Sequence, residues 1–67
     1  MKIFRRGDVY LVMHSPERSW TFDATTGLAS PEKPAVLLMG SDGRDWLPVL
    51  ETDPIPPGLH RLLIVKY

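Results

Sequence analysis

The chain has 67 residues, no cysteine, and equal numbers of basic and acidic side chains, so its formal net charge is zero. A chain of this length forms one domain that buries only about 60% of its unfolded surface, and without cysteine it lacks two common stabilisers of small proteins, disulfides and thiolate zinc sites. The zero net charge argues against sequence-independent nucleic-acid binding, which usually shows as a basic domain. The composition therefore favours a single domain, residues 1–67, stabilised by packing or by association.

Two strands are predicted in the first third of the chain. Residues 9–13 are five apolar residues in succession, a pattern typical of a strand that is covered on both faces in the middle of a sheet, or of one that lines a closed barrel with a partner outside. Residues 19–23 alternate between polar and apolar, which places Trp20 and Phe22 on the same face of a second strand. The next residues, 24–33, are small, polar and interrupted by glycine and proline, so we expect a surface loop without regular structure.

A β-hairpin is predicted in the middle of the chain. Residues 35–39 and 45–50 are largely apolar, and Asp42 and Gly43 between them supply the positive φ angles that a tight turn requires. Pro48 cannot donate a backbone hydrogen bond, so we expect its strand to lie at an edge of the sheet or to carry a bulge.

The remaining prolines predict tight connections before a final strand. Ser15 followed by Pro16 is typical of the start of a short 3₁₀ turn. Residues 52–58 contain three prolines, which predict an extended or 3₁₀ connector. We expect residues 59–67 to form the last strand, and this strand is also apolar on both faces.

These elements predict an all-β fold. Five to six short antiparallel strands, joined by one wide loop, one tight hairpin and 3₁₀ turns, are the ingredients of a small SH3-like barrel. Closing the sheet would remove the exposed edges that invite aggregation when strands are this apolar. An oligonucleotide-binding barrel uses similar pieces, but it often has a helix between its third and fourth strands, for which this sequence offers no candidate.

Two segments resemble a known family. Residues 6–12 begin with Arg-Gly-Asp and residues 33–38 begin with Lys-Pro, and together they resemble the opening of MazF/PemK-type toxin ribonucleases. In that family an Arg-Gly-Asp start to the first strand is followed, after a loop, by Arg-Pro at the start of an apolar strand. The resemblance implies an SH3-like barrel. The family's catalytic pair implies an arginine where Lys33 stands and a threonine on a later strand. As an alternative function we therefore consider a reduced ribonuclease that uses Lys33 with His14 or His60.

A second resemblance is to the PsaE subunit of photosystem I. It depends on Arg6 and Gly7, on residues 16–20, Pro-Glu-Arg-Ser-Trp, and on residues 27–30, Gly-Leu-Ala-Ser. PsaE is a docking subunit with an SH3-type barrel. This resemblance therefore implies the same architecture and a protein-binding function.

We expect a non-enzymatic module that binds another protein or forms a homodimer. Aromatic side chains dominate interface hot spots, and strands that are apolar on both faces leave one face for a neighbour to cover. The size suits an accessory or inhibitor protein, encoded by a phage or mobile element, that binds a host machine. The expected contact residues are Tyr10, Val12, Trp20, Trp46, Ile64 and Tyr67.

Charged residues suggest an alternative. Lys2, Arg5 and Arg6 form a basic patch that could contact nucleic-acid phosphates, with Trp20 or Tyr10 stacking on bases. Acidic residues occur elsewhere in the sequence, and if they gather at the opposite end of the molecule, the resulting polarity would steer docking onto a charged partner. These acidic residues are Asp42, Asp45, Glu51 and Asp53.

No catalytic, metal-binding or cofactor signature is expected. The two histidines and the aspartates follow no known ligand spacing. His14 and Ser15 are adjacent, and adjacent side chains on an extended strand point to opposite faces. Residues 1–6 are charged and lack the apolar core of a signal peptide, and no segment approaches a membrane span. We therefore expect a cytoplasmic protein without membrane association.

Overall fold

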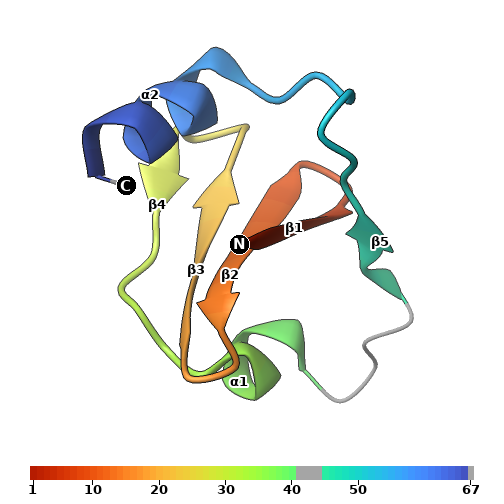
Figure 1. Ribbon diagram of the computed structural model, residues 1–67, viewed down its shortest axis with the longest axis vertical. Coiled ribbons are helices and arrows are strands. Elements are labelled where there is room, and N and C mark those ends of the chain that lie inside the picture. Colours follow the sequence, from red (N-terminus) through yellow and green to blue (C-terminus); the bar gives the residue numbers. More distant parts are fainter. Residues whose placement is uncertain (41–44, 67) are drawn as a thin grey trace.

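Five strands form one antiparallel sheet in the order β4-β3-β2-β1-β5 (Figure 1). Among the residues that the structure describes, 1–40 and 45–66 of this computed structural model, two helices accompany the sheet: α1, Ala35–Met39, and α2, Pro57–Lys66. The strands, in chain order, are β1 Lys2–Arg6, β2 Val9–Ser15, β3 Arg18–Asp23, β4 Leu28–Ala29 and β5 Leu47–Pro48.

Strands β1, β2 and β3 form two tight hairpins in succession. In the β1–β2 turn Gly7 has a φ of +61° and Asp8 has a negative φ, as a type II′ turn requires. In the β2–β3 turn, which passes through Pro16, the backbone N–H of Arg18 donates to Ser15 Oγ over 3.1 Å. Ser15 and Pro16 therefore belong to a hairpin turn, and the predicted 3₁₀ turn at this place is wrong.

One face of the sheet carries the main core. Tyr10 lies beside Phe22, and Val12 lies beside Trp20, in the β2–β3 register, and all four side chains are buried. Leu59 of α2 packs against them and is 0% exposed. The prediction that Trp20 and Phe22 share a buried face is confirmed.

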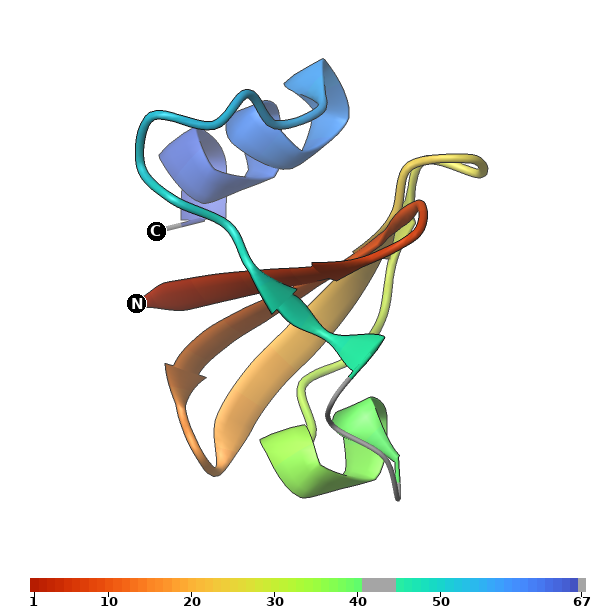
Figure 2. The ribbon, with the colours of Figure 1, turned by 90° about the vertical axis from the view of Figure 1, so that its right-hand side faces the viewer.

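The opposite face of the sheet is covered by α1. The pleat turns Leu11 and Ser19 to this side, where both are 0% exposed, and Ala35 and Trp46 are also buried. Figure 2 shows the sheet between the two helices, with α2 on one side and α1 on the other. The prediction that residues 9–13 are covered on both faces is therefore confirmed, and the cover comes from the chain itself.

The sheet is open, so the prediction of a closed SH3-like barrel is wrong. Strands β4 and β5 are its two edges and do not pair with each other. Residues 59–67, expected to be the last strand, instead fall largely within α2. A helix suits this segment because Leu59, Leu62 and Leu63 recur at intervals of three and four residues, and all three pack against the core.

The predicted hairpin between residues 35–39 and residues 45–50 is also wrong. The first of these segments forms α1, since alanine, leucine and methionine are strong helix formers. Gly40 ends the helix with a φ of +79°, which only glycine adopts readily. The predicted turn at Asp42 and Gly43 lies outside the described residues.

The edges of the sheet are short. The segment 24–33, expected to lack regular structure, contributes β4, and the N–H of Ser30 extends its ladder by donating to the carbonyl of Thr21 over 2.8 Å. The prediction that Pro48 lies in an edge strand is confirmed. The connector after β5 stays non-helical until Pro57, a residue suited to the first position of a helix.

Candidate functional site

Most of the residues expected to contact a partner lie in the interior. Tyr10, Val12, Trp20 and Trp46 are at most 6% exposed, so a partner would meet the surface above them and not their side chains. Ile64 is exposed on α2. Tyr67 lies outside the described residues.

Trp46 ties α1 to the sheet. Its Nε1 donates to the carbonyl oxygen of Met39, the last residue of α1, over 3.1 Å. The guanidinium of Arg6 in β1 lies 4.6 Å from the centre of the indole ring, within the range of a cation–π contact. These contacts hold the buried Trp46 side chain between α1 and β1, so its role in the monomer is structural.

The pleat of β1 divides the predicted basic patch between the two faces of the sheet. Lys2 and Arg6 are on the side of α1, and Arg5 is on the other side. The Nε of Arg5 donates to the carbonyl oxygen of Gly7 over 2.7 Å, and its guanidinium lies 5.7 Å from the centre of the Tyr10 ring. The three cations therefore do not form one continuous surface for phosphates.

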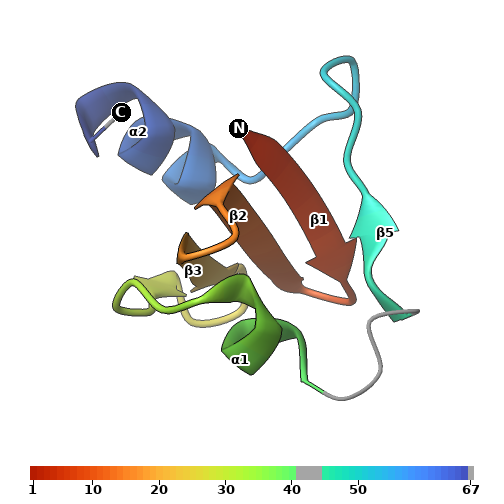
Figure 3. The same cartoon turned by 60° about the horizontal axis from the view of Figure 1, so that its bottom comes forward.

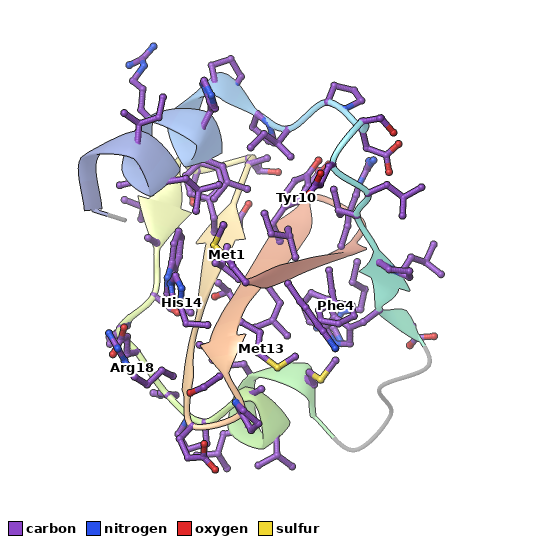
Figure 4. The ribbon with its side chains drawn as sticks, viewed as in Figure 1. Met1, Phe4, Tyr10, Met13, His14 and Arg18 are labelled. Atoms are coloured by element: carbon purple, nitrogen blue, oxygen red, sulfur yellow. The ribbon has the colours of Figure 1, made fainter. Side chains whose placement is uncertain are left out.

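The residues proposed for RNA cleavage lie on different elements. Lys33 forms a backbone bridge with Ser19, each N–H donating to the other residue's carbonyl over 3.0 Å or less. His14 is on β2 and accepts a hydrogen bond at Nε2 from Trp20 Nε1 over 3.1 Å. In Figure 4 it lies on the side of the sheet away from β5. His60 is on α2 and lines the groove described next, whereas Lys33 does not line it.

The main concave site is a groove between the start of β1, residues 48–55 and His60 of α2, which we call the β1–α2 groove. Its volume is about 670 Å³. Figure 3 shows the start of β1 between α2 and the connector that runs from β5 to α2. Most of its lining is apolar: Met1, Ile3, Phe4, Val49, Leu50 and Ile55.

The apolar lining of the β1–α2 groove reaches the surface. Met1 is 67% exposed and Leu50 is 62% exposed, whereas Ile3 and Phe4 are half-buried. Phe4 is labelled in Figure 4, where it lies on the β5 side of β1. A smaller cavity of about 360 Å³ shares Val49 with the groove and extends toward Tyr10. Exposed apolar side chains that adjoin a concave apolar floor are typical of an interaction site.

Charged residues of both signs line the β1–α2 groove. Glu51 and Asp53 belong to the connector, and Lys2 belongs to β1, where the pleat turns its side chain to the face of α1. We expected Glu51 and Asp53 at the opposite end of the molecule from the basic patch. Instead they line the same groove as Lys2. His60 lines the groove from α2.

Two positions on the outer edge of β5 offer no hydrogen-bond donor to an added strand. Val49 N–H donates to the carbonyl of Ile3 over 2.8 Å, so the amide positions of its neighbours, residues 48 and 50, point away from β1. Pro48 has no N–H, and the N–H of Leu50 donates to Asp53 Oδ2 over 3.0 Å. An incoming strand would therefore find no free donor at either position.

We expect Pro48→Thr combined with Asp53→Ala to open this edge. The double variant would present two free N–H groups, so it should form larger species than the wild type as its concentration rises, measured by light scattering. Pro48→Thr alone keeps the Asp53 cap and should associate less. A double variant with the same size distribution as the wild type would contradict this explanation of the edge.

Comparison with models of protein families, with curated proteins and with solved structures found no match. Among the described residues, no helix is long and apolar enough to span a membrane. The same part of the chain contains no group of three or more histidine or acidic side chains that could hold a metal ion. The functional argument therefore depends on the chain's own surface, and the β1–α2 groove is its best-defined feature.

Proposed function

We propose that this protein is a non-enzymatic module that binds a protein surface through the β1–α2 groove. The observation that carries the proposal is the pair of exposed apolar side chains, Met1 and Leu50, beside further apolar residues that line the groove, among them the half-buried Ile3. Burying one such side chain completely stabilises a complex by roughly 1.5–3 kcal/mol. A partner that covers the groove would gain this free energy without any change in the fold.

The exposure of the groove residues favours a protein over a small molecule as the ligand. Small-molecule sites usually enclose about 70–90% of the ligand surface. Here the two most exposed apolar residues, Met1 and Leu50, offer their surface outward. Charged residues at the margins, Lys2 and Glu51, resemble the polar rim that surrounds the apolar centre of a protein interface.

The proposal is tested by selecting peptides from a random displayed library on the immobilised protein. The selected peptides should carry closely spaced apolar residues and should bind the protein in fluorescence anisotropy. Leu50→Gln, which keeps the volume but removes the apolar character, should weaken binding roughly tenfold, equivalent to about 1.4 kcal/mol.

Leu28→Gln is the matched control for this experiment. Leu28 is 70% exposed on the edge strand β4, so it is as accessible as Leu50 but does not line the groove. Its substitution should leave peptide binding unchanged. Equal losses for the two variants, or no selectable peptide, would contradict the proposal.

A further inference from the structure

We infer that the partner segment bound by the β1–α2 groove carries an acidic side chain, and that Arg5 binds its carboxylate. This inference rests on the proposed function of the groove and names the chemistry of its partner. Arg5 lines the smaller cavity of about 360 Å³. Val49 and Asp53 line both this cavity and the groove, so one extended segment of a partner can contact the two together.

The pleat of β1 places Arg5 on the same face of the sheet as the apolar residue Ile3. The two residues are two positions apart, and Ile3 packs against the core on the side of α2. Directly across from Arg5 lie Tyr10 of β2 and Leu47 of β5. Both line the smaller cavity, where Tyr10 is buried and Leu47 is 66% exposed. The Arg5 side chain therefore adjoins apolar surface on both neighbouring strands.

Two contacts hold the Arg5 guanidinium in place. Its Nε donates to the carbonyl oxygen of Gly7 over 2.7 Å, and the group lies 5.7 Å from the centre of the Tyr10 ring. The two terminal nitrogens carry the other four N–H donors of an arginine side chain. Their shared edge can bind a carboxylate through two parallel hydrogen bonds. A guanidinium that is already held in place loses less conformational freedom when it binds such a group.

No carboxylate of the described chain is paired with Arg5. Among the described residues the only ion pair joins Arg18 and Glu32. Asp53 lines the same cavity as Arg5, but its Oδ2 accepts the N–H of Leu50 over 3.0 Å. The carboxylate that would complement Arg5 must therefore come from the partner, and opposite charges at the margin of an apolar contact are a usual source of specificity.

The spacing of Ile3 and Arg5 sets the spacing expected in the partner. Side chains two residues apart on a strand are separated by about 7 Å, and an extended partner segment has the same repeat. An apolar side chain above Ile3 and a carboxylate at Arg5 would therefore come from partner residues that are also two positions apart. We expect the bound segment to contain an apolar residue, any residue and an acidic residue, in either chain direction.

A double-mutant cycle tests the inference. Peptides selected from a random displayed library on the immobilised protein should be enriched in this spacing. One such peptide, with an amidated C-terminus, is compared by fluorescence anisotropy with its variant in which the acidic residue is replaced by the corresponding amide. Loss of the carboxylate should raise the Kd roughly tenfold for the wild type. For Arg5→Gln it should change the Kd by less than about twofold, because the carboxylate has no partner there.

Arg61→Gln is the matched control for this cycle. Arg61 is exposed on α2 and lines neither cavity, so its substitution removes the same charge and should leave the Kd of both peptides unchanged. Arg5→Lys keeps the charge but not the planar group, so it should recover only part of the affinity. Arg5 is also exposed, and its variants should keep the circular dichroism spectrum of the wild type.

The salt dependence gives an independent measurement. Binding of the acidic peptide to the wild type should weaken as salt is added, whereas binding of the amide peptide should change much less, because salt screens exposed charges. Equal effects of carboxylate removal in the wild type and in Arg5→Gln would overturn the inference. Peptides that bind only with a free C-terminal carboxylate would also overturn it, since the carboxylate would then belong to a chain end.

The outcomes for the carboxylate and for the proposed function are separable. Selected peptides that lack an acidic residue but lose affinity for Leu50→Gln overturn the inference about Arg5 and leave the protein-binding function in place. A protein that selects no peptide overturns both.

Discussion

Leu59→Ala is expected to lower the free energy of unfolding by about 2–5 kcal/mol. Leu59 is 0% exposed and joins α2 to the core residues of β2 and β3. At roughly 0.05–0.15 kcal/mol per residue, a chain of this length has a total stability of about 3–10 kcal/mol. The substitution should therefore remove a large part of the stability, measured by urea denaturation with far-ultraviolet circular dichroism.

Ile64→Ala is the control for this prediction. It truncates an aliphatic residue of the same helix, but Ile64 is 67% exposed, so the expected loss is below about 0.5 kcal/mol. Equal losses for the two variants would contradict the docking of α2 through Leu59.

Strands β2 and β3 were predictable because their side-chain pattern has a single interpretation. Alternation placed Trp20 and Phe22 on one face, and the apolar run of residues 9–13 indicated cover on both faces. β1 was not predicted, since its charged residues obscure the apolar pair Ile3 and Phe4. In the structure this pair lies half-buried on opposite faces of the strand.

The helices were missed because short apolar runs fit a strand or a helix equally well. Residues 35–39 and 59–67 both read as apolar strands, and their composition, rich in leucine, was the signal that favoured helices. Helices α1 and α2 cover the two faces of the sheet. The apolar side chains of the strands are therefore buried by helices of the same chain, without closure of the sheet into a barrel.

The candidate site was missed for a related reason. Aromatic residues such as Trp20 and Trp46 are frequent interface anchors, but a domain of this size needs them for its own core. The apolar pattern of residues 45–50 predicts that Leu50 lies in a paired strand, whereas in the structure it precedes a turn closed by Asp53. In the structure Leu50 is 62% exposed.

His14→Leu is expected to destabilise the protein by about 1–3 kcal/mol, although leucine is the more apolar residue. Trp20 is 3% exposed, and its Nε1, which can only donate, gives its hydrogen bond to His14 Nε2 over 3.1 Å. That acceptor requires a neutral imidazole with its proton on Nδ1. Leucine would fill much of the volume but would leave the indole N–H in the core without this acceptor.

His14→Gln separates this hydrogen bond from packing, because the glutamine carbonyl oxygen can accept at the position of Nε2. We expect the glutamine variant to recover most of the stability that the leucine variant loses, as measured by urea denaturation. The intrinsic tryptophan fluorescence of the leucine variant should also shift relative to the wild type, since the environment of Trp20 changes. If leucine proves at least as stable as glutamine, the Trp20 N–H does not depend on His14, and packing on the α2 side of the sheet outweighs the hydrogen bond.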